Sequence, residues 1–191
     1  MFTLSLPPGH DTEAARQAAQ FLVRETLNDG SPVTIRAARP DDKELIVTAF
    51  RALAPGSIYA RFFHAKTQLS EEELRHLTEI DYVSAVVLLT TVGARQQETL
   101  IGLGRYVASE GSAEVAFVVA DDYGGRGIAG RLLRHLRHMA RDSGIAKFEA
   151  DVLEDNAAML AVFRESGLPM TTTHSEGVIH VTLLLSKPQA L

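Results

Sequence analysis

The segment from Glu114 to Ala140 constrains the fold of this chain more than any other. It starts with an apolar run, Glu114–Ala120, continues through a loop with three glycines, and ends in a long amphipathic stretch. This pattern predicts a strand that leads through a tight loop into a helix. Glycines let a ligand approach the backbone, and the first N–H groups of a helix lack intrahelical partners. These N–H groups and the positive end of the helix dipole attract anions, so the segment predicts a site that suits a pyrophosphate.

Two other phosphate-binding loops and a plain turn are alternatives for this loop. A Walker A loop needs a lysine followed by serine or threonine, whereas Arg126 is followed by Gly127 and Ile128. A Rossmann loop has the pattern G-x-G-x-x-G, which residues 125–130 match, and Glu149 and Asp151 lie near the expected distance of its acidic residue. Two strand-like runs joined only by turns precede the loop, however, and predict an antiparallel meander instead. From the residues alone, an ordinary strand-to-helix turn is an equal alternative.

Composition excludes several classes of protein. The chain has 191 residues, of which 46% are hydrophobic and 23% charged, so one domain with a full core is expected. There is no cysteine, which excludes disulfides and an acyl-cysteine intermediate. The net charge of −5 argues against a nucleic-acid partner and favours a cationic substrate. Because no apolar run approaches the roughly 18 residues of a membrane helix and no secretory signal is evident, we expect a cytoplasmic protein without a membrane partner.

The chain divides into an extension and one domain. Residues 1–32 are predicted to form an N-terminal helical extension, with a helix from Asp11 to about Leu27. Residues 33–191 are predicted to form the domain, in the order strand, three helices, three strands, glycine loop, helix, strand, helix and two strands. The predicted strands are 33–37, 85–92, 99–107, 114–120, 147–153, 170–176 and 178–185. His135 and His138 lie one helical turn apart, but no third metal ligand is evident, so no metal site is expected.

The glycine loop resembles one family. Residues 122–129 are similar to the acyl-CoA pyrophosphate loop of the GNAT N-acetyltransferase superfamily, Q/R-x-x-G-x-G/A. Gly127 and Ala129 match, while Gly124 stands where Gln or Arg is usual. An R-x-x-x-P-x-D turn between the first strand and helix is also how many GNAT domains begin. The resemblance implies an α/β GNAT acyl-CoA N-acyltransferase fold, a mixed, mostly antiparallel twisted sheet flanked by helices, whose middle strands diverge to admit the pantetheine arm.

The same resemblance implies acetyl-CoA as co-substrate and no metal. It assigns the pyrophosphate to the loop residues Gly124, Gly125, Arg126, Gly127, Ile128, Ala129 and Gly130. A strand N–H near Val118 or Val119 is expected to polarise the thioester carbonyl or bind the pantetheine amide. Asn156 begins a segment that resembles the N-x-x-M/A element of the family, whose asparagine contacts the cofactor. From sequence alone, Asn156 is equally well explained as a helix N-cap.

Glu114 is the candidate general base. It is the acid at the head of the strand that leads into the glycine loop, and apolar neighbours predict that its carboxylate is desolvated. The spacing by itself is equally compatible with a charged strand end facing water. Residues 113–117, however, resemble the strand on which several protein-lysine-acetylating GNAT members carry their catalytic glutamate. Phe163 stands where many relatives have a tyrosine that protonates the leaving thiolate. In this chain the general acid is therefore Tyr123, another group or solvent, or the thiolate leaves without an acid.

A second motif resembles a narrower group. Ser57-x-Tyr59-x-Arg61-Phe62-Phe63 is similar to bacterial Pat-like protein lysine acetyltransferases and to the acetyltransferase domains fused to NDP-forming acyl-CoA synthetases. This resemblance implies an N-acetyltransferase acting on a protein lysine, with an acyl-CoA synthetase as one candidate partner. The alternatives are an N-acetyltransferase of a small amine and a non-catalytic acyl-CoA-binding domain. Arg61 is expected to pair with Asp81 or to shape the acceptor groove, and the oligomeric state is left open.

Overall fold

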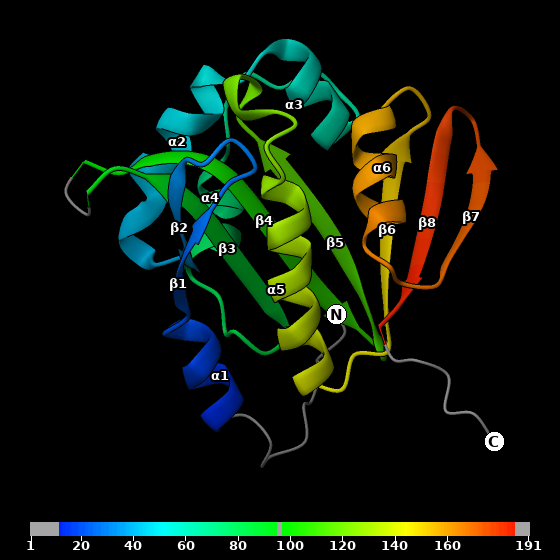
Figure 1. Ribbon diagram of the computed structural model, residues 1–191, viewed down its shortest axis with the longest axis horizontal. Helices are drawn as coiled ribbons and strands as arrows, with labels where there is room; N and C mark the ends of the chain where they lie inside the picture. Colours follow the sequence, from blue (N-terminus) through cyan, green and yellow to red (C-terminus); the bar gives the residue numbers. More distant parts are fainter. Residues whose placement is uncertain (1–11, 95–96, 186–191) are drawn as a thin grey trace.

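The computed structural model describes residues 12–94 and 97–185, which form one eight-stranded sheet with α-helices on both faces (Figure 1). The strands are β1 (Leu22–Thr26), β2 (Pro32–Ala37), β3 (Ala85–Val92), β4 (Thr99–Ser109), β5 (Ser112–Val119), β6 (Lys147–Leu153), β7 (Met170–Ser175) and β8 (Val178–Leu184). The helices are α1 (Thr12–Ala19), α2 (Lys43–Ala52), α3 (Pro55–Phe62), α4 (Glu71–Thr78), α5 (Ile128–Asp142) and α6 (Ala157–Glu165), with short 3-10 turns η1 (Pro40–Asp42) and η2 (Asp121–Tyr123). From β2 onward this is the predicted order of elements.

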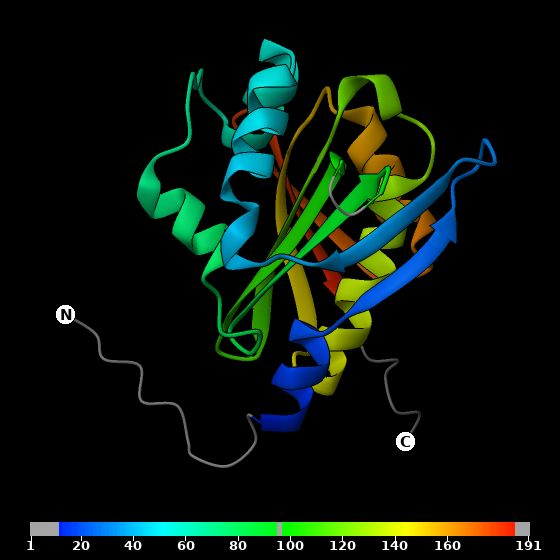
Figure 2. The ribbon, with the colours of Figure 1, turned by 90° about the vertical axis from the view of Figure 1, so that its left-hand side faces the viewer.

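The two faces of the sheet carry different helices. Figure 2 shows α2 and α4 on one side and α5 on the other. The larger core lies under α5 and α6, where Leu132, Leu136 and Phe163 are almost fully buried against the sheet. A smaller core joins α2 and α4 to β3 and β4, with Ile46 and Leu74 at its centre. None of the helices in the described part of the chain is long and apolar enough to cross a bilayer.

The sheet opens in its middle. The strand order is β1-β2-β3-β4-β5-β6-β8-β7, and all neighbours are antiparallel except β5 and β6. These two parallel strands pair only over residues 112–114 and 147–149, and then separate (Figure 1). The remaining edge of β5, residues 115–119, therefore has no partner strand on the β6 side. This confirms the divergence of the middle strands predicted from the family resemblance.

The N-terminal extension differs from its prediction. The predicted helix to about Leu27 was wrong, because α1 ends at Ala19 and β1 follows at residues 22–26. β1 pairs with β2 over its full length and is an edge strand of the sheet. Helix-forming residues such as Leu22 and Glu25 suggested a continuous helix, but pairing with β2 overrides this local preference. The residues preceding Thr12 lie outside the described part of the chain.

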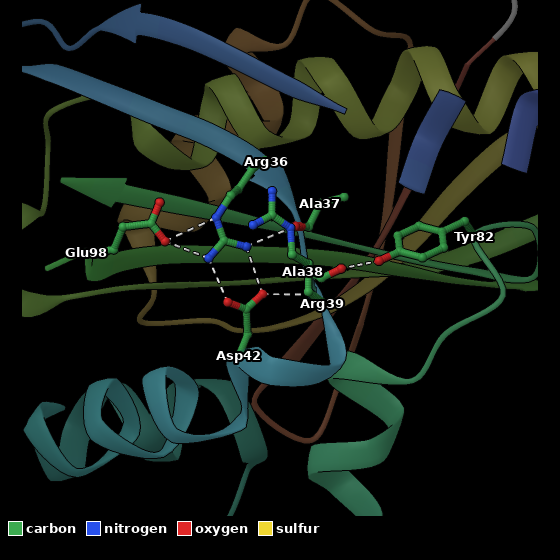
Figure 3. Close-up of polar contacts among 7 residues, drawn as sticks. All are labelled: Arg36, Ala37, Ala38, Arg39, Asp42, Tyr82 and Glu98. Carbon is green, nitrogen blue, oxygen red and sulfur yellow. Dashed lines mark hydrogen bonds and ion pairs between the residues drawn. The ribbon is translucent and has the colours of Figure 1, made fainter. Parts of the chain in front are cut away.

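A buried ionic cluster joins β2 to η1 and to the start of β4 (Figure 3). Arg36 donates to both carboxylate oxygens of Asp42, at 2.8 and 2.6 Å, and to Glu98 at 3.3 and 2.7 Å. Asp42 also accepts the Arg39 N–H at 2.7 Å, and the Tyr82 hydroxyl donates to the Ala38 carbonyl nearby. The R-x-x-x-P-x-D pattern thus has a structural cause here: its arginine and aspartate are ion-pair partners.

Candidate active site

The glycine loop presents free N–H groups at the start of α5. Gly127, the N-cap, has φ 83°, and Gly125 has φ 72°, conformations that favour glycine. A Cβ at Gly127 would lie 2.4 Å from an Arg131 nitrogen and 2.9 Å from Asn28, so this position cannot take a side chain without rearrangement. Among the described residues, no backbone carbonyl accepts a hydrogen bond from the N–H groups of residues 125–130. The loop is therefore suited to bind an anion.

The Arg126 side chain contacts neighbouring protein groups and stabilises the glycine loop. Its guanidinium pairs with Asp29 at 2.8 Å, donates to the Asp122 carbonyl at 2.7 Å, and lies 4.7 Å from the ring centroid of Tyr123. The Asn28 N–H donates to the Arg126 carbonyl at 3.2 Å. The turn after β1 thus holds the loop in place, which the sequence did not indicate.

A large cavity runs from the glycine loop along the free edge of β5. Its volume is about 810 Å³, and α3, the end of β5, the glycine loop and one side of α6 line it. The predicted site residues in this lining are Val118, Val119, Gly124, Gly125, Gly127, Ile128, Ala129 and Asn156. Arg126 and Gly130 do not line it. Asn156 is also the N-cap of α6, since its side chain accepts the Met159 N–H at 3.1 Å.

The backbone N–H groups of Val118 and Val119 point to opposite sides of β5. The Ala120 N–H donates to the Ile101 carbonyl of β4 at 2.9 Å. Because N–H groups of successive residues point to opposite sides of a strand, the Val119 N–H faces away from β4, toward the open edge. The Val118 N–H faces β4. Of the two expected donors, Val119 is therefore the one that can reach a ligand in the cavity.

Glu114 lines a second cavity, of about 280 Å³, between the end of α3, β5, β6 and α6. Its side chain is exposed, so the expected desolvation by its apolar neighbours was wrong. In a strand, Val115 and Phe117 point to the opposite face from Glu114 and cannot cover it. Asn156 and Phe163 line the same cavity, and the buried Phe163 ring packs edge-on against Phe117, 6.2 Å away. This cavity and the larger one share Asn156, so they are adjacent.

Arg61 was expected either to pair with Asp81 or to shape the acceptor groove. Its side chain lines both of these cavities and a third one on the α2 side. Burial and the nearby Arg105 charge lower the pKa of Arg61 to about 10, although Glu114 and Glu73 act in the other direction. The expected pair with Asp81 is not formed. Asp81 instead accepts the N–H groups of Val83, Ser84 and Ala85 and the Ser84 hydroxyl.

Asp121 positions the helix that carries Arg61. It follows β5 directly, and its carboxylate accepts the Ala54 N–H at 2.7 Å and the Ser57 hydroxyl. The hydrogen bond from Ser57 and then that from Ala54 lower the pKa of Asp121. Asp121 is therefore ionised, and its carboxylate holds the start of α3 over the end of β5. No local motif signals this contact, because its partners are more than 60 residues apart in sequence.

The histidines of α5 do not form a metal site. His135 lies 2.5 Å from the Glu25 carboxylate, and its ring lies 5.0 Å from that of Phe21, while His138 is exposed. Residues 12–94 and 97–185 contain no group of three His, Asp or Glu side chains that could hold a metal ion. His135 instead helps to attach β1 to α5.

Comparison with known proteins explains this arrangement. The profile of the acetyltransferase (GNAT) family matches residues 57–168, which include Glu114, the glycine loop and Asn156. The chain belongs to the GNAT acetyltransferase family. It is 33% identical over 137 residues to Acetyltransferase PA5475 of Pseudomonas aeruginosa, covering 71% of this chain and 74% of that protein. It is also 33% identical over 159 residues to Acetyltransferase Pat of Mycolicibacterium smegmatis.

Structural similarity agrees with the family. The GNAT domain of S. lividans PAT superposes with a TM-score of 0.78 at 32% identity, covering 85% of this chain and 96% of that one. The match to Pat of M. smegmatis covers 81% of this chain but only 47% of Pat, so this GNAT chain spans about half of that relative. Its fold is thus the GNAT fold, as predicted.

As a GNAT acetyltransferase, the protein takes its acetyl group from acetyl-CoA. Two features of the structure fit this donor. The N–H groups of the glycine loop lie free at one end of the large cavity, where a pyrophosphate would bind. The unpaired edge of β5 continues from there toward Glu114 and offers N–H groups to an extended pantetheine arm.

Proposed function

We propose that this GNAT enzyme acetylates the ε-amine of a protein lysine, with Glu114 as general base. The observation that carries the proposal is the exposure of Glu114 in a cavity adjacent to the cofactor groove. A lysine on a folded protein can reach an exposed carboxylate, whereas a small amine is usually bound in an enclosed pocket. The resemblance to Pat supports the same acceptor class, and an acyl-CoA synthetase is one candidate substrate.

The proposed reaction is direct transfer within a ternary complex. The pyrophosphate would lie on the free N–H groups of residues 125–130, since the Gly124 N–H already donates to the Asp121 carbonyl at 3.2 Å. Asn156 would lie beside the pantetheine arm. The Val119 N–H would donate to the thioester carbonyl, which stabilises the oxyanion as the amine attacks. The C–N bond forms, the C–S bond breaks, and coenzyme A leaves as a thiolate. Glu114 takes one proton from the lysine ammonium, whose ordinary pKa is about 10.4, and passes it to solvent. The second proton leaves the same nitrogen as the amide forms and goes to solvent or to the coenzyme A thiolate.

The leaving group needs no dedicated acid in this proposal. Phe163 is buried and has no proton to give, and it packs against Phe117 at the base of the cavity. Tyr123 lines the cofactor cavity, but its ring lies under the guanidinium of Arg126. A thiolate is a weaker base than an amine, since a thiol has a pKa of about 8.5 and a lysine ammonium one of about 10.4, so the thiolate can leave without prior protonation.

The test follows release of coenzyme A thiol from acetyl-CoA with three kinds of acceptor: an acyl-CoA synthetase, lysine peptides and small polyamines. We expect release with a protein or peptide lysine, and a loss of about 100-fold or more in Glu114→Gln, the usual contribution of a general base. Glu149→Gln is the matched control, because Glu149 lies opposite Glu114 on β6 but binds Lys147 at 2.5 Å.

Other outcomes would redirect the assignment. Release with small amines alone would make the protein a small-molecule acetyltransferase. If Glu114→Gln kept full activity, its role as base would be wrong. Binding of acetyl-CoA without turnover of any acceptor would favour an acyl-CoA-binding domain without catalysis.

A further inference from the structure

Two arginines next to Glu114 have no anionic partner. Arg61 lies in α3, and Arg105 lies in β4 directly opposite Ala116 of β5. Ala116 is two residues from Glu114, so Arg105 and Glu114 point to the same face of the sheet. The ion pairs among residues 12–94 and 97–185 include neither Arg61 nor Arg105. Two neighbouring cations in this part of the chain thus make no direct ion pair, and Glu114 and Glu73 act on Arg61 only through longer-range charge interactions.

Both arginines line one cavity, which adjoins the cofactor groove on the α2 side and shares Arg61, Val118 and Ala120 with it. It has a volume of about 260 Å³ and lies between α2, α3, α4 and the β4–β5 face. Its walls are mostly apolar, with side chains such as Phe50, Leu77 and Leu103. Its single acid is Glu73, which already binds Lys66 at 2.9 Å and the Ser70 N–H at 2.8 Å. The arginines therefore give this cavity a net positive charge in an apolar setting.

We propose that this cavity is a second part of the acceptor site, in which Arg61 and Arg105 bind a carboxylate that the acceptor carries close to its reactive lysine. The inference rests on the proposed function and specifies its substrate class: lysines with an aspartate or glutamate nearby in sequence. Arg61 lines both this cavity and the one that contains Glu114. A lysine amine at Glu114 and a carboxylate at the arginines would therefore be neighbours, within about three residues of an extended chain.

The electrostatics favour a carboxylate over other occupants. A lysine or polyamine would be repelled by two guanidiniums. An anion would supply the direct ion-pair partner that Arg61 lacks, and burial and Arg105 already lower the pKa of Arg61 in its absence. The mostly apolar walls lower the local dielectric constant, which strengthens an ion pair relative to one at the surface. Arginine binds carboxylates through two parallel hydrogen bonds, so the pair would also fix the orientation of the acceptor.

The experiment compares lysine peptides that differ only in one residue near the lysine: glutamate, glutamine or lysine. Peptide affinity is measured by calorimetry in the presence of coenzyme A, and turnover by thiol release. We expect the glutamate peptide to bind about tenfold more tightly than the glutamine peptide, as for a close charge pair. Arg105→Gln and Arg61→Gln should each remove this preference. Arg51→Gln, a change at an exposed arginine of α2, should keep it.

The outcomes distinguish a failure of the carboxylate site from a failure of the proposed catalysis. Equal affinity for the glutamate and glutamine peptides, a preference that survives in both arginine variants, or no peptide binding at all would overturn the carboxylate site. A charge preference in binding without thiol release would support the carboxylate site and contradict the proposed catalysis. If butyryl-CoA proved a better donor than acetyl-CoA and neighbouring charge had no effect, the cavity would hold the acyl chain, and the inference would be wrong.

Discussion

Arg36 and Arg61 are both largely withdrawn from solvent, but their charges are balanced in different ways. Arg36 donates four hydrogen bonds to Asp42 and Glu98 (Figure 3). The hydrogen bond with Asp42 raises its pKa, and this outweighs the opposing effect of burial. For Arg61, burial and Arg105 dominate and lower the pKa to about 10.

This difference separates a structural charge from a functional one. The Arg36 cluster is complete within the fold, since both carboxylates and the guanidinium satisfy one another. Arg61 lies where three cavities meet and has only more distant charges around it. A buried charge without a partner destabilises a fold, so its presence at a cavity indicates a role in binding. The comparison can be tested by making the same substitution at both positions.

The largest loss in the free energy of unfolding is expected for Arg36→Gln. The change leaves the buried Asp42 and the partly buried Glu98 without a cation, and breaking a buried pair costs about 3–5 kcal/mol. Urea denaturation would measure this loss in the free energy of unfolding, with the exposed Arg51→Gln as control. A loss below about 1 kcal/mol would show that water or rearrangement replaces the cluster, and that it is no more structural than a surface pair.

A smaller loss is expected for Glu98→Gln. Arg36 would keep both hydrogen bonds to Asp42 and lose the charge-assisted ones to Glu98, which are worth about 2 kcal/mol. Unfolding of the single and double variants would give the coupling between the two positions. If Glu98→Gln cost as much as Arg36→Gln, the cluster would depend on Glu98 rather than on the Arg36–Asp42 pair.

Arg61→Gln should behave in the opposite way. Removing a half-buried cation without an ion-pair partner should leave the free energy of unfolding unchanged or raise it by about 1 kcal/mol. Binding of an acidic lysine peptide should fall by about tenfold, equivalent to about 1.4 kcal/mol. Denaturation without ligand and peptide calorimetry would measure the two effects. A large loss of stability together with unchanged binding would make Arg61 a structural residue like Arg36.

These two arginines also show what the sequence could reveal. The R-x-x-x-P-x-D pattern holds Arg36 and Asp42 six residues apart, so a local motif signals their pairing. The strand, glycine loop and helix around Gly127 are similarly local, and their prediction was correct. Arg61 depends on α3 packing over β5, through an Asp121 contact that spans 64 residues and leaves no local signal. Its unpaired charge is visible only in the folded chain.

The same limit explains the error at the N-terminus. Hydrophobic periodicity placed the helices and strands from residue 33 onward, because each buries one face. For residues 22–26 the partner decides the structure: β1 exists because β2 pairs with it and because Glu25 meets α5. The exposure of Glu114 was missed for a related reason, since apolar neighbours in a strand point to the opposite face.

Glu25 provides a third, more exposed charge cluster, for which the smallest effect is expected. Its carboxylate lies 3.2 Å from Arg131, 2.7 Å from Arg134 and 2.5 Å from His135, and so attaches β1 to α5. Burial alone would raise the pKa of Glu25, but the hydrogen bonds from His135 and Arg134 lower it overall. Glu25→Gln should therefore reduce the free energy of unfolding by about 1 kcal/mol near neutral pH, the upper range for a partly exposed pair.

The pH dependence of this loss identifies its cause. A carboxylate whose pKa is lower in the folded state stabilises the fold above its unfolded pKa, and this contribution disappears as the pH falls through the folded pKa. The unfolded value for Glu25 is 4.5, so wild type and Glu25→Gln should differ at neutral pH and converge below 4.5. Urea denaturation at several pH values would measure the difference. A gap that persists in acid would mean that the shape of the glutamate side chain, and not its charge, holds β1 against α5.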